Sequence, residues 1–160
     1  LLFLKRFMQN SATCVTLSIG SGRGHIGLAN VLDAISPAGQ VFRLWQGYRA
    51  GDLVFISGQA GIEGNGQSVG RGDFDAQANQ AFRNLDRALR AGGSSLRSVI
   101  KVTIYLTDMG QFSKIVELRG KWFTAPYPAD TIVEVSSLYS PEAMIEIEAI
   151  AVRDEAAPRS

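Results

Sequence analysis

Residues 99–108 read VIKVTIYLTD, a run in which apolar and polar side chains alternate. Apolar side chains occupy the even-numbered positions from Ile100 to Leu106, and Lys, Thr and Tyr occupy the odd-numbered positions from Lys101 to Thr107. A period of two residues places the two sets on opposite faces of an extended chain. The pattern therefore predicts a half-buried strand over residues 99–107 with one polar face.

Helices are predicted on both sides of this strand along the chain. Asp73 can cap a helix that starts directly after it, and Gly92-Gly93 can end that helix. Asp108 can cap a second helix, which Pro126 and Pro128 end. Apolar residues recur at helical spacing in both segments, at Phe74, Ala78, Ala81, Phe82, Leu85, Ala88 and Leu89 in the first and at Phe112, Ile115, Val116, Trp122 and Phe123 in the second.

Four further runs are rich in apolar and β-branched residues and predict strands, at residues 41–45, 53–57, 131–135 and 143–152. Residues 47–52 separate the first two runs and predict the turn of an antiparallel hairpin. The resulting order, strand–strand–helix–strand–helix–strand–strand, indicates an α+β fold in which two helices cover one face of a mixed sheet. Because no element is left to cover the second face, we expect that face to pack against other copies of the chain.

Composition excludes several classes of protein. The chain has 160 residues, enough for one domain with an ordinary core. Its 46% hydrophobic and 19% charged residues exclude a disordered or collagen-like chain, and no apolar run is long enough to span a membrane. A net charge of +1 argues against a nucleic-acid partner. Cys14 is the single cysteine, which excludes an internal disulfide and a cysteine-rich metal site. His25 is the single histidine, which excludes a multi-histidine zinc site.

The N-terminal segment differs in composition from the rest. Residues 1–8 are apolar and basic, and the first acidic residue is Asp33. This segment is interpreted either as an organelle transit peptide or as a non-native extension with Met8 as the true start. Residues 22–27 match the G-x-G-x-x-G pattern. Dinucleotide binding would require a helix over residues 28–35 and then a second parallel strand, which the sequence does not offer, so a flexible linker is the favoured interpretation.

These observations divide the chain into an N-terminal extension at residues 1–40, one domain at 41–153 and a short tail at 154–160. The domain carries every strand and helix signal described above. We expect a cytoplasmic location, with organelle targeting by the N-terminal segment as the alternative.

Five stretches of the domain together resemble a known family. They are residues 51–59, 77–89 with Asn84 inside, 99–108, 128–135 and 145–152. Their order and spacing resemble the reactive-intermediate deaminase family (Rid, or YjgF-type, formerly labelled L-PSP endoribonuclease). The resemblance implies a chorismate-mutase-like subunit with a six-stranded mixed sheet and two helices on one face. It also implies a homotrimeric barrel with a cleft at each subunit interface. Deaminases of this family hydrolyse amino-acid imines and enamines and release ammonia without a metal or an organic cofactor, so none is expected.

Part of the family's site is present. Glu146 matches the glutamate that positions the attacking water, and one carboxylate can both activate a water and shuttle a proton. Ser57 and Gly58 match residues at the floor of the cleft. The alternatives are a structural strand charge paired to a basic group for Glu146, and a strand-end hydroxyl bonded to the backbone for Ser57. Glu134 and Glu148 are interpreted as structural.

Other family positions have changed. Asp130 follows Pro128-Ala129, where the deaminases have an arginine that binds the substrate carboxylate through two hydrogen bonds. Ile132 stands at the position of a cysteine, and Val116 at that of an asparagine. The aromatic residue of the first strand falls at Leu44, with Trp45 adjacent. We expect Asp130 to repel a carboxylate, unless it is only a solvated loop acid or an ion-pair partner of a helix.

Three functions follow from this combination. The first is hydrolysis of a small imine or enamine that lacks a carboxylate or carries a positive amine. The second is a non-catalytic trimer that binds a small ligand or a partner protein, which the lost arginine, cysteine and asparagine favour. The third is an endoribonuclease, which the near-neutral charge and the absence of an aromatic-basic patch oppose. The partners expected are therefore a small molecule and two further copies of the chain, with neither nucleic acid nor membrane.

Overall fold

The structure, a computed structural model, describes residues 30–32 and 45–154. The strand predicted at residues 41–45 lies outside the described residues except for Trp45. The glycine motif, Cys14 and His25 also lie outside them. In the part of the chain that the structure describes, no helix combines the length and the apolar character needed to cross a membrane.

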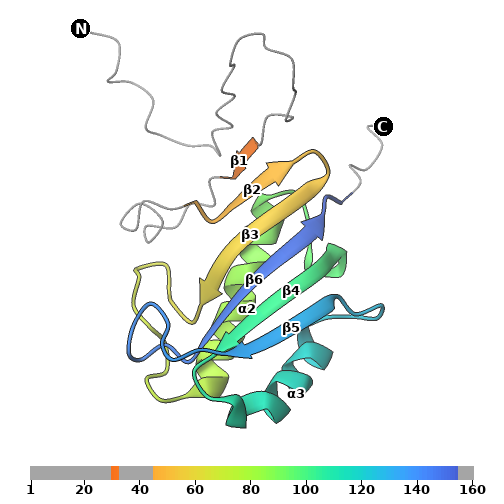
Figure 1. The fold of residues 1–160 in the computed structure, drawn as a ribbon. Coiled ribbons are helices and arrows are strands. Elements are labelled where there is room, and N and C mark those ends of the chain that lie inside the picture. The colour runs from red at the N-terminus through yellow and green to blue at the C-terminus, as the bar shows by residue number, and fades with distance from the viewer. Residues whose placement is uncertain (1–29, 33–44, 155–160) are drawn as a thin grey trace, which may run out of the picture.

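The strands form one mixed sheet. The elements in chain order are β1 Asn30–Leu32, β2 Gly47–Ala50, β3 Leu53–Ala60, α2 Phe74–Ala91, β4 Val99–Leu106, α3 Phe112–Trp122, β5 Ala129–Glu134 and β6 Ile145–Val152. The strand order across the sheet is β1-β2-β3-β6-β4-β5, in which β1 has only three residues (Figure 1). β4 and β5 run parallel, and the other neighbours run antiparallel. The predicted α+β class and the mixed sheet are confirmed.

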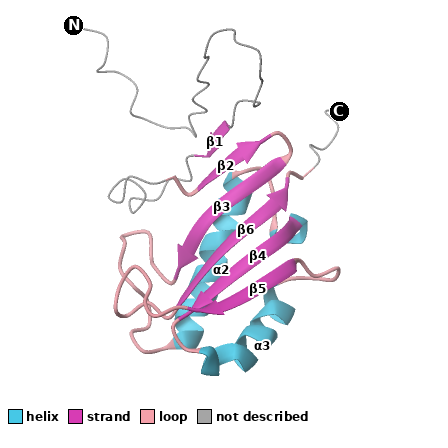
Figure 2. Ribbon diagram, viewed as in Figure 1, coloured by secondary structure: helices cyan, strands magenta, loops and turns pink. Residues whose placement is uncertain are grey.

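Both helices lie against the same face of the sheet, as predicted (Figure 2). The core between these layers is built from apolar side chains of α2, α3 and the inward faces of β3, β4 and β6. Phe82 of α2 stacks on Trp122 of α3 with ring centroids 5.5 Å apart, which joins the two helices. The alternation of Ile145, Ile147 and Ala149 against Glu146 and Glu148 along β6 is observed as buried and half-buried positions.

The helix boundaries follow from the capping residues that the sequence indicated. The Asp73 carboxylate accepts a hydrogen bond from the backbone N–H of Ala76 at 3.0 Å, and Gly93, at φ 76°, follows the end of α2. The Asp108 carboxylate accepts a hydrogen bond from the N–H of Gly110 at 2.8 Å in a short 3₁₀ turn. Because this turn comes first, α3 begins at Phe112 rather than directly after Asp108.

Two local predictions were wrong, those for the hairpin turn and for Ile100. The hairpin turn is confined to Gly51-Asp52, because Gly51 adopts the left-handed conformation (φ 62°), and residues 47–50 form β2 instead of a loop. Residues 30–32, which the rejected dinucleotide interpretation would place in a helix, form β1, which pairs with β2. Ile100 is exposed rather than buried, because a bulge between Val99 and Lys101 shifts the alternation by one residue.

In the part of the chain that the structure describes, no helix covers the second face of the sheet. It presents apolar and polar side chains together, among them Phe55, which is 39% exposed, and Val133, which is 37% exposed. Lys101, Thr103 and Tyr105 of β4 and Glu146 and Glu148 of β6 lie on this face as well. The packing of this open face against other copies of the chain stays a prediction.

Asn84 of α2 fixes the end of β3 to the helix layer. Its amide nitrogen donates to the carbonyl oxygens of Ala60 at 2.9 Å and Ile62 at 2.8 Å, and its amide oxygen accepts from Gln80 at 3.0 Å and Arg87 at 3.1 Å. The Asn84 side chain is buried, and so is its hydrogen bond to Ala60, whereas that to Ile62 is part-buried. Asn84 therefore holds the segment that follows Gly58 and Gln59 in place.

Replacing Asn84 should destabilise the protein. Asn84→Ala removes one donor from each of the Ala60 and Ile62 carbonyl oxygens, of which the Ala60 oxygen keeps the Ile62 N–H, and the free energy of unfolding should fall by about 1–3 kcal/mol in urea titrations. Asn65→Ala is the matched control, since Asn65 lies in an exposed loop, and it should change the free energy by less than ~0.5 kcal/mol. Equal losses in both variants would show that Asn84 does not anchor β3.

Candidate functional site

The Glu146 carboxylate lies directly over Gly58. Glu146 is the second residue of β6, and Gly58 lies on the neighbouring β3, where a bulge between Ile56 and Gln59 interrupts the strand register. A methyl group at Gly58 would lie 2.6 Å from Cδ of Glu146 and closer still to its Oε1. Only a residue without a side chain therefore leaves room for the carboxylate in this position.

The carboxylate of Glu146 has a perturbed acidity. Burial raises its pKa above that of an ordinary glutamate, and the nearby charge of Glu148 raises the pKa further. Among the described residues, no side chain or backbone group forms an ion pair or a hydrogen bond with this carboxylate, so the interpretation as a paired structural charge finds no support in them. A half-buried, unpaired carboxyl group with a raised pKa is suited to proton transfer near neutral pH.

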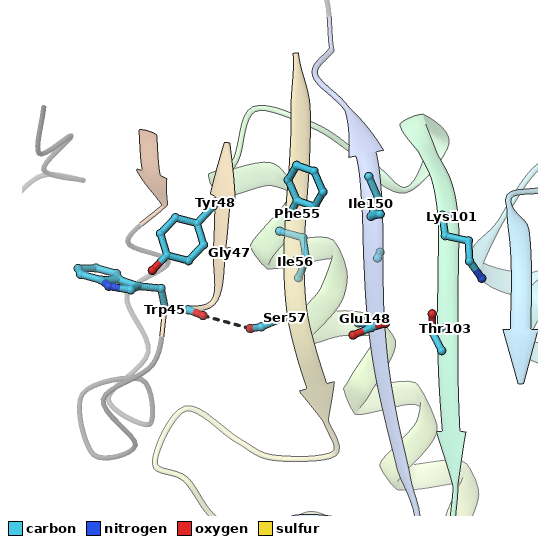
Figure 3. A pocket seen from close by; sticks show the side chains of 11 residues that line it. Trp45, Gly47, Tyr48, Phe55, Ile56, Ser57, Lys101, Thr103, Glu148 and Ile150 are labelled. Atoms are coloured by element: carbon cyan, nitrogen blue, oxygen red, sulfur yellow. Dashed lines mark hydrogen bonds between the residues drawn. The ribbon is translucent and has the colours of Figure 1, made fainter. Parts of the chain in front are cut away.

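Ser57 lies beside this pair at the edge of a depression on the open face (Figure 3). The Ser57 Oγ lies within hydrogen-bond distance of two backbone oxygens, those of Trp45 at 3.2 Å and Gln46 at 3.0 Å. The interpretation of Ser57 as a hydroxyl bonded to the backbone is confirmed. The bond ties the strand to the segment that carries the Trp45 side chain, which is 44% exposed.

The depression has a volume of about 430 Å³ and lies between aromatic and polar walls. Trp45, Tyr48 and Phe55 form one side, and Glu148, Thr103 and Lys101 form the other (Figure 3). The Lys101 ammonium donates to the Thr131 hydroxyl at 2.6 Å and to the carbonyl of Val102 at 2.9 Å. Lys101 is therefore bonded toward β5 rather than toward Glu148.

Asp130, Ile132 and Val116 lie elsewhere, on the helix-covered side of the sheet. Asp130 and Ile132 alternate with Thr131 on β5 and stand in register with the buried residues Val102 and Ile104 of β4. Ile132 packs against the core. A second depression of about 280 Å³ lies between β5 and α3 and is lined by Val116, Arg119, Gly120, Phe123, Tyr127, Pro128 and Asp130.

Asp130 is paired with Arg119 of α3. The Nε atom of Arg119 lies 2.6 Å from Oδ2 of Asp130, an ion-pair distance at which the N–H does not align for a hydrogen bond. Both Asp130 oxygens are buried, and the side chain is 15% exposed against 28% for Arg119. Burial raises the pKa of Asp130, and the charges of Arg119 and Lys101 oppose that rise.

This ion pair changes the interpretation of Asp130. The alternative of an ion-pair partner on the helix side is confirmed, whereas that of a solvated loop acid is wrong because the carboxylate is buried on a strand. The expected repulsion of a carboxylate by Asp130 loses its basis, since Arg119 balances the charge and is the more exposed member of the pair. A ligand in the second depression would meet a net-neutral pair.

The predicted site residues therefore fall into two groups within one chain. We call Ser57, Gly58 and Glu146 the carboxylate half-site, on the open face, and Val116, Arg119 and Asp130 the ion-pair half-site, on the helix side. Sequence reasoning missed Arg119, although its spacing of three residues from Val116 puts both on one side of α3. Its pairing with Asp130 depends on the packing of α3 against β5, for which the sequence carries no direct signal.

Comparison with known proteins identifies the family. The family model described as Endoribonuclease L-PSP matches residues 33–153. The chain belongs to this family, the Rid or YjgF-type proteins.

Similar proteins come from distant organisms. A RutC family protein of Pyrococcus horikoshii is 41% identical over 109 residues, which cover 68% of this chain and 86% of the relative. A 2-iminobutanoate/2-iminopropanoate deaminase of Mus musculus is 34% identical over 100 residues, covering 62% of this chain and 73% of that protein. The crystal structure of RidA from the Antarctic bacterium Psychrobacter sp. PAMC 21119 superposes with a TM-score of 0.63 at 35% identity, covering 68% of this chain and 86% of that one.

The close contact of the Glu146 carboxylate with Gly58 can be tested with a double-mutant cycle. Gly58→Ala should lower the free energy of unfolding by about 1–3 kcal/mol, because the new methyl group overlaps the carboxylate. The same change should cost much less in a Glu146→Ala background, where the overlapping atoms are gone. Gly64→Ala is the matched control, since a methyl group there meets no atom within 4 Å. An equal loss of unfolding free energy on Gly58→Ala in both backgrounds would contradict the close contact between Glu146 and Gly58.

Proposed function

We propose that the protein is a hydrolase of small imines or enamines. The observation that carries this proposal is the Glu146 carboxyl group, which is half-buried, has a raised pKa and lies against Gly58 without a partner among the described residues. Membership of the Rid family and the names of relatives such as the mouse 2-iminobutanoate/2-iminopropanoate deaminase support the reaction class.

One carboxylate can carry both protons of this reaction. Ionised Glu146 takes a proton from water as the water oxygen bonds to the imine carbon and the C=N electron pair moves to nitrogen. The nitrogen then takes that proton from Glu146, which gives a carbinolamine. Glu146 next takes the hydroxyl proton as the C=O bond forms and the C–N bond breaks, and it returns the proton to the departing nitrogen as ammonia.

The ion-pair half-site bears on the substrate. Arg119 is neutralised by Asp130, so a substrate carboxylate would gain less there than from an unpaired arginine. This supports a substrate without an α-carboxylate, and we expect slow turnover of 2-iminopropanoate.

The two half-sites are proposed to meet between subunits of a homotrimer. They lie on opposite sides of one sheet, so one chain cannot bring both to the same ligand. The open face, with its exposed Phe55 and Val133, supports packing against further copies of the chain. Each interface would then combine the carboxylate half-site of one subunit with the ion-pair half-site of the next.

A non-catalytic binding trimer is the second candidate. The observation that favours it is the replacement of a free arginine by a neutral ion pair. Endoribonuclease activity, which the description of the family model names, has weaker support, because the chain has a net charge of only +1. A cytoplasmic location stays a prediction.

Ammonia release from a panel of imines distinguishes the two candidates. The native protein should release ammonia from at least one neutral or cationic imine generated in situ. Glu146→Gln should lower the rate by at least ~100-fold, because an amide cannot accept the proton. Glu134→Gln, a matched change on β5 away from Gly58, should retain most of the rate. A native protein that hydrolyses none of the imines would favour the binding trimer.

Breaking the Arg119–Asp130 ion pair should increase activity on a substrate that carries a carboxylate. Asp130→Asn keeps the shape of the side chain but leaves Arg119 unneutralised, so kcat/KM for 2-iminopropanoate should rise about tenfold. Adding Arg119→Gln to Asp130→Asn should remove that gain, since no cation is then available. If folded Asp130→Asn gains nothing on this substrate, the ion pair does not limit the choice of substrate.

A further inference from the structure

Two side chains that the proposed chemistry does not use lie on the same sheet face as Glu146. Glu148 follows Glu146 by two residues on β6, so both carboxylates project from the open face. Tyr105 of β4 stands directly opposite Glu146 in the strand register, and its hydroxyl donates to Oε1 of Glu148 at 3.1 Å. Tyr105 thus faces Glu146 across the strand pair and reaches diagonally to the carboxylate of Glu148.

The surroundings of the two carboxylates differ. Glu148 accepts the Tyr105 hydrogen bond, which fixes the position of its carboxylate on the open face. Glu146 is half-buried and accepts no hydrogen bond from the described residues. Burial raises the pKa of Glu146, and the charge of Glu148 raises it further.

The other groups on the neighbouring strands are uncharged or are bonded elsewhere. β3 presents Ser57 and Gly58 to Glu146, and neither ionises near neutral pH. On β4 the charged group is Lys101, whose ammonium is bonded to Thr131 and to a backbone oxygen. Burial, the hydrogen bond to Glu148 and the charges of Glu148 and Glu146 raise the pKa of Tyr105, so its hydroxyl keeps the proton that it donates.

We propose that Glu148, fixed by its hydrogen bond from Tyr105, is a positioning residue that favours the protonated form of Glu146. Glu148 supplies the negative charge that holds the proton on its neighbour, and Tyr105 keeps that charge in place. A use of this arrangement in catalysis rests on the proposed imine hydrolysis. The effect of Glu148 on the protonation of Glu146 is a property of the folded protein alone.

The titration of Glu146 tests the proposal without any substrate. Protein carrying ¹³C-labelled glutamate carboxyl groups is titrated by NMR, and the Glu146 resonance is assigned by its loss in Glu146→Gln. Glu148→Gln should shift the Glu146 midpoint to lower pH, because the like charge is removed. Tyr105→Phe should shift the Glu146 midpoint in the same direction but by less, because the Glu148 charge is then no longer held in place by the hydrogen bond. Tyr48→Phe, the matched control on the same face, should leave the midpoint unchanged.

The pH profile of turnover adds a second readout. If ionised Glu146 is the base, kcat/KM falls as the pH drops through the pKa of Glu146, and Glu148→Gln should move this acid limb to lower pH. An unchanged Glu146 titration in both Glu148→Gln and Tyr105→Phe overturns the proposal, even in a protein that hydrolyses imines. The expected titrations in a protein that hydrolyses none of them uphold the proposal and overturn the proposed function instead.

Discussion

The fit of the Glu146 carboxylate over Gly58 is the constraint on which the rest of the site depends. The carboxylate occupies space that any side chain at position 58 would fill, and the bulge in β3 beside it brings the two strands to this arrangement. Asn84 holds the end of β3 and the residues after it to the helix layer through hydrogen bonds to the carbonyl groups of Ala60 and Ile62. The acidity of Glu146 then follows from its burial and from Glu148, and not from a direct partner among the described residues.

The second constraint is electrostatic. Asp130 is buried against Arg119, and each charge makes the other tolerable in a half-buried position between β5 and α3. The pair places a guanidinium group next to an open depression while cancelling most of its attraction for anions. Under the proposed function, this pair would change which charges a ligand of the depression can carry.

The sequence was sufficient to predict the layers of the fold, because capping residues such as Asp73 and alternation along β6 are local signals. It failed for β2, where the positive φ of Gly51 moved the turn, and at Ile100, where a bulge reversed the alternation. The role of Glu146 could be proposed from its match to the family, but its contact with Gly58 could not. The Arg119–Asp130 pair was also out of reach, because it joins residues of two elements whose packing is set by the whole core.

The central claim is that each complete site is shared between two chains, and mixed oligomers test it most directly. Glu146→Gln disables the carboxylate half-site, and Gly120→Phe fills the ion-pair half-site from a helix position with open space around it. Each variant alone should be inactive in ammonia release. Random co-assembly of equal amounts should restore about a quarter of the native rate, because one interface in four then joins two intact half-sites. A mixture that stays as inactive as its two components would contradict a shared site.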